Sequence, residues 1–471
     1  MRCPLHQAAR EFGASPALLK ADTGGSFPDA ASTSKNDVGK RFTLRGKSVS
    51  GWSFSDWDAA VEALRPTVRG TGAVALHAPD NFAGAALLFA ALRENRPVAL
   101  LSHRLPPTEL DDACQRLGIS QRWSGPATPI PAQRSPSPDG TGITPGIATV
   151  LLTSGSSGRP KAVAHTAQAH LANAAGSHDN IPFAPGHVWL RSLSLHHVGG
   201  LAMLFRALHG GGAVAFPEHG VPLGRACRQF SATHLSVVAT QLQRLLAEGP
   251  PPDLAAVLVG GGPIPPELVT AARGVGVPIH TTYGMTEMGS QVATTPPGAT
   301  PEQLRTAGRP LPGRLVRIDD GGEILVRGAP KMAGYLRDDG TLDPGVDGEG
   351  WYHTGDVGTL EDGWLRVTGR KDLMFISGGE NIYPEEIERV LMGIDGVLAA
   401  VVVAVPDPTW GRRPVAFVLG QFEEAALRAA LRDRLAGFQV PDRVFAWPGD
   451  APGWSGKPPR RWFMARAAEL V

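Results

Sequence analysis

Residues 151–166, LLTSGSSGRPKAVAHT, place small hydroxyl side chains, two glycines and a lysine directly after an apolar run. Free backbone N–H groups and hydroxyls in such a loop can surround phosphate oxygens, while a lysine neutralises their charge. The residues of this predicted phosphate loop are Thr153, Ser154, Gly155, Ser156, Ser157, Gly158 and Lys161. The stretch lacks the glycine spacing and the GK[ST] ending of a Walker A loop. Taken alone, it is also compatible with a flexible surface loop.

Four further motifs follow in the chain. They are TTYGMTEMGS at 281–290, HTGDVGTLEDGWLRVTGRKD at 353–372, ISGGENIYPEEIE at 376–388 and GWSGKPPRR at 453–461. Together with the phosphate loop, their order resembles that of the adenylate-forming superfamily, which includes acyl-CoA synthetases, luciferases and the adenylation domains of peptide synthetases. This resemblance implies an ATP-dependent reaction in which a carboxylate attacks the α-phosphate and pyrophosphate leaves. Because the acid is already ionised near neutral pH, the site needs cations, N–H donors and a metal rather than a general base.

The resemblance also implies roles for individual residues in nucleotide binding. Glu287 would bind Mg²⁺, which typically takes one or two carboxylates in addition to substrate phosphates. Thr286 would hydrogen-bond the α-phosphate, Asp356 would hold the ribose hydroxyls, and Arg370 would contact ribose and phosphate. The remaining nucleotide-binding candidates, around the adenine, are Gly260, Gly261, Gly262, Tyr283, Gly284 and Met285. Outside this motif context the same residues would be ordinary core, hairpin and surface positions.

A second step transfers the acyl group to the thiol of coenzyme A. By the resemblance, Lys457 would contact the attacking carboxylate and the α-phosphate during adenylation, and it must leave before the thiol enters. The superfamily achieves this by rotating the small C-terminal domain about a hinge, which matches Asp372. The loop that would then line the thiol tunnel consists of Ser377, Gly378, Gly379 and Glu380.

The acid substrate is predicted from residues 193–217 and 233–246, which look most like those of o-succinylbenzoate-CoA ligases of menaquinone biosynthesis. His197, assigned here a catalytic and acyl-binding role, and Gly200 would form one wall of the acid pocket. The second carboxylate of this dianion needs donors or a cation of its own. The candidates are Arg206, Arg244, Ser290 and Gln291. Two alternatives stay open: a ligase for another aryl or fatty acid, and a catalytically silent nucleotide-binding protein.

Composition favours small-molecule partners. The chain of 471 residues is 42% hydrophobic and 19% charged, and its formal net charge of +1 argues against a nucleic-acid binder. Its three cysteines have no metal-type spacing, which suits a reducing compartment. The N-terminus lacks the apolar core of a secretion signal, and no apolar run is long enough to span a bilayer. We therefore expect a cytoplasmic enzyme; its oligomeric state, with a homodimer among the options, stays open.

The elements that must position these residues are predicted to be α/β. Residues 72–101 indicate a strand, a helix from about residue 81 to 93, and a second strand, and similar strand–helix units recur up to about residue 290. After about residue 314, short strands joined by Asp-Gly turns predict a small β-barrel-like subdomain. We expect a large N-terminal domain of doubly wound sheets at 1–370 and a smaller, mobile α+β domain at 371–471. Residues 20–48 and 123–148, rich in Pro, Ser, Gly and Thr, are predicted to be exposed loops.

Overall fold

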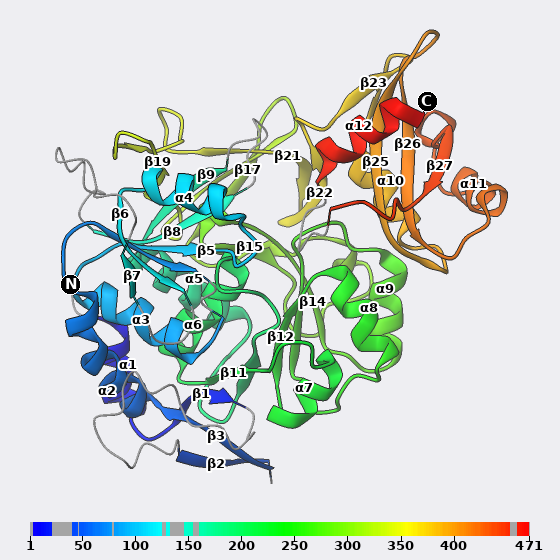
Figure 1. Ribbon diagram of the computed structural model, residues 1–471. Coiled ribbons are helices and arrows are strands. Elements are labelled where there is room, and N and C mark those ends of the chain that lie inside the picture. Colours follow the sequence, from blue (N-terminus) through cyan, green and yellow to red (C-terminus); the bar gives the residue numbers. More distant parts are fainter. Residues whose placement is uncertain are drawn as a thin grey trace.

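A computed structural model describes residues 3–20, 40–45, 47–77, 80–124, 129–131, 146–153, 160–452 and 459–470. The chain forms two large mixed sheets, a four-stranded antiparallel sheet and a small C-terminal α+β unit (Figure 1). The strands of the three N-terminal sheets interleave in sequence. None of the described helices combines the length and the apolar composition that crossing a bilayer requires.

The ten-stranded sheet carries most of the strand ends at the candidate site. Its order is β16 (Arg309–Pro310), β15 (Ser290–Thr294), β14 (Ile279–Met285), β13 (Ala256–Val259), β12 (His234–Val237), β10 (Val188–Leu190), β11 (Ala213–Phe216), β1 (Pro16–Lys20), β3 (Lys47–Ser53) and β2 (Lys40–Leu44). The strands from β14 through β1 in this order pair in parallel, so their carboxyl ends reach the same edge of the sheet.

The eight-stranded sheet has the order β20 (Leu342–Asp343), β19 (Gly334–Leu336), β9 (Lys161–Thr166), β8 (Ile147–Thr153), β5 (Val98–Leu101), β4 (Ala73–His77), β6 (Ile119–Ser124) and β7 (Pro129–Pro131). The predicted βαβ unit is confirmed: β4 and β5 pair in parallel around α3 (Phe82–Arg93), which Asn81 caps. Thr166 likewise caps α5 (Ala167–Asn180), where its side chain accepts a hydrogen bond from the N–H of Ala169. The phosphate stretch, however, joins two antiparallel strands, and Lys161 opens the second strand instead of lying in a loop before a helix.

Two predicted loops contain strands. Residues 40–44 form β2 and residues 129–131 form β7, both at outer edges of their sheets. Their sequences, KRFTL and PIP, mix polar residues or prolines with apolar ones, and this composition suits an edge strand because one side of its backbone needs no partner.

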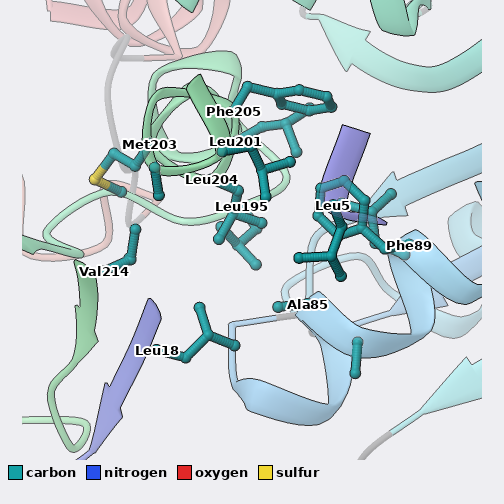
Figure 2. Close-up of a cluster of buried hydrophobic side chains, with 14 of the residues drawn as sticks. Leu5, Leu18, Ala85, Phe89, Leu195, Leu201, Met203, Leu204, Phe205 and Val214 are labelled. Atoms are coloured by element: carbon teal, nitrogen blue, oxygen red, sulfur yellow. The ribbon is translucent and has the colours of Figure 1, made fainter. Parts of the chain in front are cut away.

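The remaining helices of the large N-terminal part cover the faces of the two sheets. They are α1 (Pro4–Phe12), α2 (Phe54–Leu64), α4 (Pro107–Arg116), α6 (Val198–Gly210), α7 (Leu223–Phe230), α8 (Ala239–Ala247) and α9 (Pro266–Gly274). Between the sheets, side chains from α1, α3 and α6 converge in one apolar cluster, where Leu5, Phe89 and Phe205 lie close together (Figure 2). Burial of this surface is the main contribution that holds the two sheets together.

The predicted β subdomain is the four-stranded sheet β17 (Arg314–Ile318), β18 (Glu323–Gly328), β21 (Tyr352–Glu361) and β22 (Trp364–Arg370). One of the predicted Asp-Gly turns, at Asp362 and Gly363, joins β21 to β22 as a hairpin, with φ values of 51° and 79°. Its apolar face packs against β15 through residues such as Val292 and Ile324. This contact fixes β21 and β22 beside the end of β14.

The C-terminal unit contains the hairpin β23 (Phe375–Ser377) and β24 (Glu380–Ile382), the sheet β25 (Val397–Asp407), β26 (Gly411–Gly420) and β27 (Arg443–Ala446), and helices α10 (Pro384–Leu391), α11 (Glu424–Arg432) and α12 (Arg460–Leu470). Its two core clusters draw only on residues from Phe375 onward. It lies over α8 and α9 in Figure 1, where Arg434 and Glu267 form an ion pair of 3.3 Å. A domain boundary between residues 370 and 371 stays a prediction.

Candidate active site

The end of β14 places three candidate residues on one turn. The strand runs parallel to β13 and ends at Met285, and the 3₁₀ turn η3 (Thr286–Met288) then leads into the antiparallel strand β15. Gly289, at φ 63°, closes this turn in the left-handed region that favours glycine. Thr286 and Glu287 therefore lie at the carboxyl edge of the sheet, where ligands bind in open α/β sheets.

The adjacent glycine turn follows β13. A Cβ atom on Gly260 would come within 2.7 Å of Thr282 on β14, so the turn can approach that strand only with glycine. Gly261 has a φ of 82°, and it is exposed together with Gly262. This turn and the strand carrying Tyr283 are thus neighbours, and their role in binding adenine stays a prediction.

Tyr283, Asp356 and Arg370 form one hydrogen-bonded group. The Tyr283 hydroxyl donates to Asp356 Oδ2 at 2.5 Å, and Arg370 Nη1 donates to Asp356 Oδ1 at 3.3 Å. Burial and the nearby Asp356 carboxylate raise the pKa of Tyr283 well above its usual value, so the hydroxyl remains a donor. Asp356 and Arg370 come from β21 and β22, where they are direct cross-strand partners.

Arg370 also contacts the predicted hinge residue. Its Nε and Nη2 atoms donate to the two carboxylate oxygens of Asp372 at 2.8 and 3.1 Å. The hydrogen bonds that Arg370 donates to Asp372, together with the charge of Asp356, raise the pKa of Arg370. The guanidinium thereby links Asp356 on β21 to Asp372, which lies just before the hairpin β23–β24.

Glu287 is held by residues that the motifs did not indicate. Tyr335 donates its hydroxyl to Glu287 Oε1 at 2.9 Å, and the hydroxyls of Tyr335 and Tyr352 are 2.8 Å apart. Burial and the Glu287 charge raise the pKa of both tyrosines, so their hydroxyls remain protonated. The Nζ atom of Lys161 lies 4.7 Å from the centre of the Tyr335 ring. Lys161 and Glu287 are therefore neighbours of the same aromatic side chain.

The acid-pocket candidates divide into buried and exposed residues. Arg206 on α6 is 4% exposed; its Nη2 donates to Gln291 Oε1 at 2.7 Å, and its guanidinium lies 4.7 Å from the Trp189 ring centre. Burial lowers the pKa of Arg206 to about 9. Arg244, by contrast, is exposed on α8. Ser290 is half-buried next to Gln291, with a φ of 135°.

His197 occupies the N-cap position of α6, where its side chain makes no capping hydrogen bond, and its neighbour His196 is buried. The two rings lie 4.3 Å apart, and partial desolvation lowers the pKa of His197. At Gly200, a Cβ atom would come within 2.1 Å of the Ser194 carbonyl oxygen, so only glycine lets α6 begin this close to the preceding loop.

The candidate coenzyme A loop is the turn between β23 and β24. Gly378 and Gly379 have φ values of 59° and 92°, while Ser377 is buried and accepts a hydrogen bond from Arg413 at 3.2 Å. Glu380 is exposed. The hairpin lies at the outer end of the C-terminal unit, away from β14 (Figure 1).

Part of the candidate set falls outside the described residues. Ser154, Gly155, Ser156, Ser157, Gly158 and Lys457 belong to it. Of the phosphate stretch, the structure describes Thr153 at the end of β8, opposite Lys161 at the start of β9. The roles of all these residues stay predictions.

Comparison with known proteins places this geometry in a family. The AMP-binding enzyme family matches residues 145–336, and its C-terminal domain matches residues 386–452. The solved structure of an E. coli MenE variant with bound OSB-AMS is 32% identical and covers 98% of both chains with a TM-score of 0.78. The chain belongs to the AMP-binding enzyme family.

Relatives within the AMP-binding family include the 2-succinylbenzoate–CoA ligase of Salmonella typhimurium, which is 42% identical over 306 residues. That match spans 64% of this chain and 65% of the relative's length. The o-succinylbenzoate CoA synthetase of Bacillus subtilis has been solved with its acyl-adenylate intermediate OSB-AMP; it is 26% identical, with a TM-score of 0.80 over 98% of each chain. The same enzyme has been solved with ATP and magnesium ion, at a TM-score of 0.78.

The residues around Glu287 are suited to Mg²⁺, the ion with which the Bacillus subtilis enzyme was solved. The Glu287 carboxylate and the surrounding hydroxyls are oxygen donors, which Mg²⁺ prefers, and a single protein carboxylate is enough where phosphates supply further ligands. Within the described ranges, the one cluster of three or more potential metal ligands is Asp319, Glu323 and His353, and it does not include Glu287.

Proposed function

We propose that this chain is an ATP-dependent 2-succinylbenzoate–CoA ligase. It forms an acyl-adenylate from the acid and ATP and then an acyl thioester with coenzyme A. The family membership supports the adenylate chemistry, and the names of the relatives support the acid. An aromatic dicarboxylate also accounts for one otherwise costly feature of the fold, the burial of Arg206.

The buried Arg206 guanidinium is the observation that carries the choice of acid. Among the described residues, no carboxylate offsets its charge, and its Nε atom has no hydrogen-bond partner. A buried cation without a counter-ion is unfavourable unless a ligand supplies the opposite charge. We assign this place to the carboxylate of 2-succinylbenzoate that does not react, with Gln291 beside it. A monocarboxylic fatty acid would leave the guanidinium unpaired.

In the first step, a carboxylate oxygen of the acid forms a bond to the α-phosphorus. The bond from that phosphorus to the oxygen bridging to the β-phosphate breaks, and its electron pair leaves with pyrophosphate. Mg²⁺, when bound at Glu287, offsets the charge on the phosphate oxygens. Thr286 donates to the α-phosphate, Asp356 accepts from the ribose hydroxyls, and Lys457 brings the two anions together.

In the second step, the thiolate sulfur of coenzyme A forms a bond to the acyl carbon, and the acyl–oxygen bond breaks as AMP leaves. The Ser377–Glu380 turn has to reach the site for this step. Rotation of the small C-terminal domain about Asp372 would bring it there and withdraw Lys457. Lys457→Ala should therefore abolish adenylate formation and spare thioester formation from supplied adenylate; loss of both half-reactions would contradict this assignment.

The deciding experiment measures acid-dependent pyrophosphate release from the purified protein, with and without coenzyme A. The acids are 2-succinylbenzoate, benzoate, and short and long fatty acids, and thioesters are identified by mass spectrometry. Release with 2-succinylbenzoate alone, followed by its thioester, is expected. Preference for another acid would keep the chemistry and reject the assignment of Arg206, while inactivity with every acid would favour the catalytically silent alternative.

Two arginine variants test the acid pocket. Arg206→Ala should raise the KM for 2-succinylbenzoate by at least about tenfold, because hydrogen bonds to charged groups contribute roughly 1.5–3 kcal/mol, and it should leave the KM for ATP within about twofold. Arg244→Ala is the matched comparison, because that side chain is exposed on α8. If Arg244→Ala raised the KM for 2-succinylbenzoate more than Arg206→Ala did, Arg244 would be the residue that binds the second carboxylate. The sequence had named both as candidates.

A further inference from the structure

Two buried polar side chains lie directly behind the candidate metal and phosphate turn. They are His165 on β9, with 0% of its surface exposed, and Asn173 on α5, with 1% exposed. His165 lies near the end of the 151–166 stretch but has no assigned role in the reaction, and Asn173 lies outside all the motifs. Buried polar groups lower stability unless they form hydrogen bonds, so their partners indicate why they are there.

Both side chains donate to main-chain carbonyls of this turn. His165 Nε2 lies 2.7 Å from the Thr286 carbonyl oxygen, and since a carbonyl only accepts, Nε2 carries the hydrogen. Asn173 Nδ2 donates to the carbonyl oxygens of Met288 at 3.0 Å and Gln291 at 3.2 Å. The two side chains therefore fix the backbone on either side of Glu287.

The Glu287 carbonyl is fixed as well, by a backbone bond of 2.8 Å from the N–H of Met332. As a result, each of the three residues of η3 has its carbonyl oxygen bonded to a group in a different segment of the fold. A short 3₁₀ turn has few hydrogen bonds of its own, so these outside donors decide which way its side chains point. Thr286 and Glu287 are the side chains so directed.

We propose that His165 is a positioning residue for magnesium and ATP, acting through its hydrogen bond to the Thr286 carbonyl. Asn173 supports the same turn from its other end. His165 touches neither nucleotide nor metal: it holds the Thr286–Glu287 backbone in the orientation in which the hydroxyl and the carboxylate meet the phosphates and the ion. This role rests on the proposed function of Thr286 and Glu287.

His170 provides a matched control within the same buried pair. Its ring lies 4.9 Å from that of His165 and is equally buried, but its Nε2 bonds Thr149 Oγ1 at 2.7 Å instead of the turn. Replacing either ring should therefore lower thermal stability. Only replacement of His165 removes a donor from the turn.

The experiment measures binding of ATP with magnesium by calorimetry, alongside pyrophosphate release. Binding is independent of the acid, so a wrong substrate assignment would alter turnover and leave this test intact. His165→Leu and His165→Met, which lack an N–H donor, should weaken magnesium-dependent ATP binding by about tenfold or more, the range seen when residues that orient a metal ligand are removed. The KM for the acid should change less than about twofold.

His165→Gln is the conservative variant, because the amide Nε2 of glutamine can take the place of the ring nitrogen as donor. It should restore ATP binding to within about threefold of the unsubstituted protein. His170→Leu should leave ATP binding within the same limit despite a lower Tm. Restoration by glutamine is a result that a role in packing alone would not give.

Three outcomes would overturn the proposal. The first is unchanged magnesium and ATP binding in folded His165→Leu or His165→Met protein. The second is an equal loss of binding in His170→Leu. The third is failure of both donor-less variants to fold while His170→Leu folds, because the ring would then be required by the fold and not by the turn.

Discussion

Tyr283 donates its hydroxyl hydrogen to Asp356 Oδ2 across a distance of 2.5 Å. The two residues come from different sheets, β14 of the ten-stranded sheet and β21 of the four-stranded sheet. Their bond therefore fixes the β subdomain to the end of β14 at the point where we place the nucleotide. Asp356 is oriented before any ribose hydroxyl arrives, which lowers the ordering cost of binding.

Tyr283→Phe tests this preorganisation, because phenylalanine keeps the aromatic ring and removes only the hydroxyl. A hydrogen bond to a charged group contributes roughly 1.5–3 kcal/mol, so the KM for ATP should rise about tenfold. The KM for the acid should not change. Steady-state kinetics with each substrate varied in turn measure both values, and an effect confined to the acid would refute the placement of the ribose.

Tyr335→Phe should alter the response to magnesium. The variant loses the donor at Glu287 Oε1, leaving the carboxylate free to rotate away from the ion. We expect the magnesium concentration for half-maximal pyrophosphate release to rise by about tenfold, as for other residues that orient a metal ligand. Tyr352→Phe is the companion variant: the Tyr352 hydroxyl lies 2.8 Å from that of Tyr335 and also interacts with Glu287, so its loss should shift the response to magnesium in the same direction.

The ion pair between Arg434 and Glu267 joins the C-terminal unit to α9. Both side chains are partly exposed, so the pair contributes less than about 1 kcal/mol. Arg434→Glu should reduce the rate of adenylate formation by no more than about fivefold and leave thioester formation unchanged. The double exchange Arg434→Glu with Glu267→Arg should restore the rate; persistence of the defect would show that the pair does not stabilise the arrangement seen here.

Arg460 and Glu388 form a buried ion pair inside the C-terminal unit. Arg460 Nη1 and Nη2 bond the two Glu388 oxygens at 2.5 and 2.9 Å, and Nη1 also donates to the Val402 carbonyl. Arg460→Met leaves an unpaired buried carboxylate and should lower the free energy of unfolding by about 3–5 kcal/mol. Denaturant titration measures the loss. The exposed pair Arg466–Glu469 is the control, and Arg466→Ala should change stability by less than about 1 kcal/mol.

Acid should destabilise the fold through histidines buried in neutral form. Burial lowers the pKa of His234 to about 3, from 6.5 in the unfolded chain. The unfolded state therefore binds more protons below pH 6.5, and stability falls as the pH drops from 6.5 towards 3, by at most about 1.4 kcal/mol per pH unit for each such group. His234→Gln should reduce the difference in Tm between pH 7.5 and pH 5.0. An unchanged difference would assign the acid sensitivity to other groups.

Local signals predicted much of the fold. The apolar runs of residues 72–101 predicted β4, α3 and β5, and the Asp-Gly turn at Asp362 predicted the β21–β22 hairpin. Elements whose composition is polar were harder to predict: β2 is stabilised by pairing with β3, which no local pattern reports. Lys161 was placed in a loop because β9, the strand that it begins, is short and polar at both ends.

The sequence predicted those residues of the candidate site that belong to a recognisable motif. Tyr283 with Asp356, and Asp356 with Arg370, belong to motifs far apart in sequence that the fold brings together. Tyr335, Asn173 and His165 were missed because their partners are carbonyls and a carboxylate from other segments. A single tyrosine or histidine in a strand carries no sign of such a partner before the tertiary structure is known.

The parallel pairing of β1 with β11 joins Leu18 to Val214, so one of the first strands to leave the ribosome completes its sheet only after some two hundred further residues have been made. Contacts of such long sequence separation slow folding, and the unfinished edge stays open to other chains in the meantime. Recombinant production should therefore depend on chaperone supply and on the speed of synthesis more than the stability of the finished protein would suggest. Removing the residues before β3 would take β1 from between β11 and β3 and expose an apolar edge of β11, which would keep only β10 as a neighbour. Tags and fusions should therefore be added ahead of α1, with α1 and β1 retained.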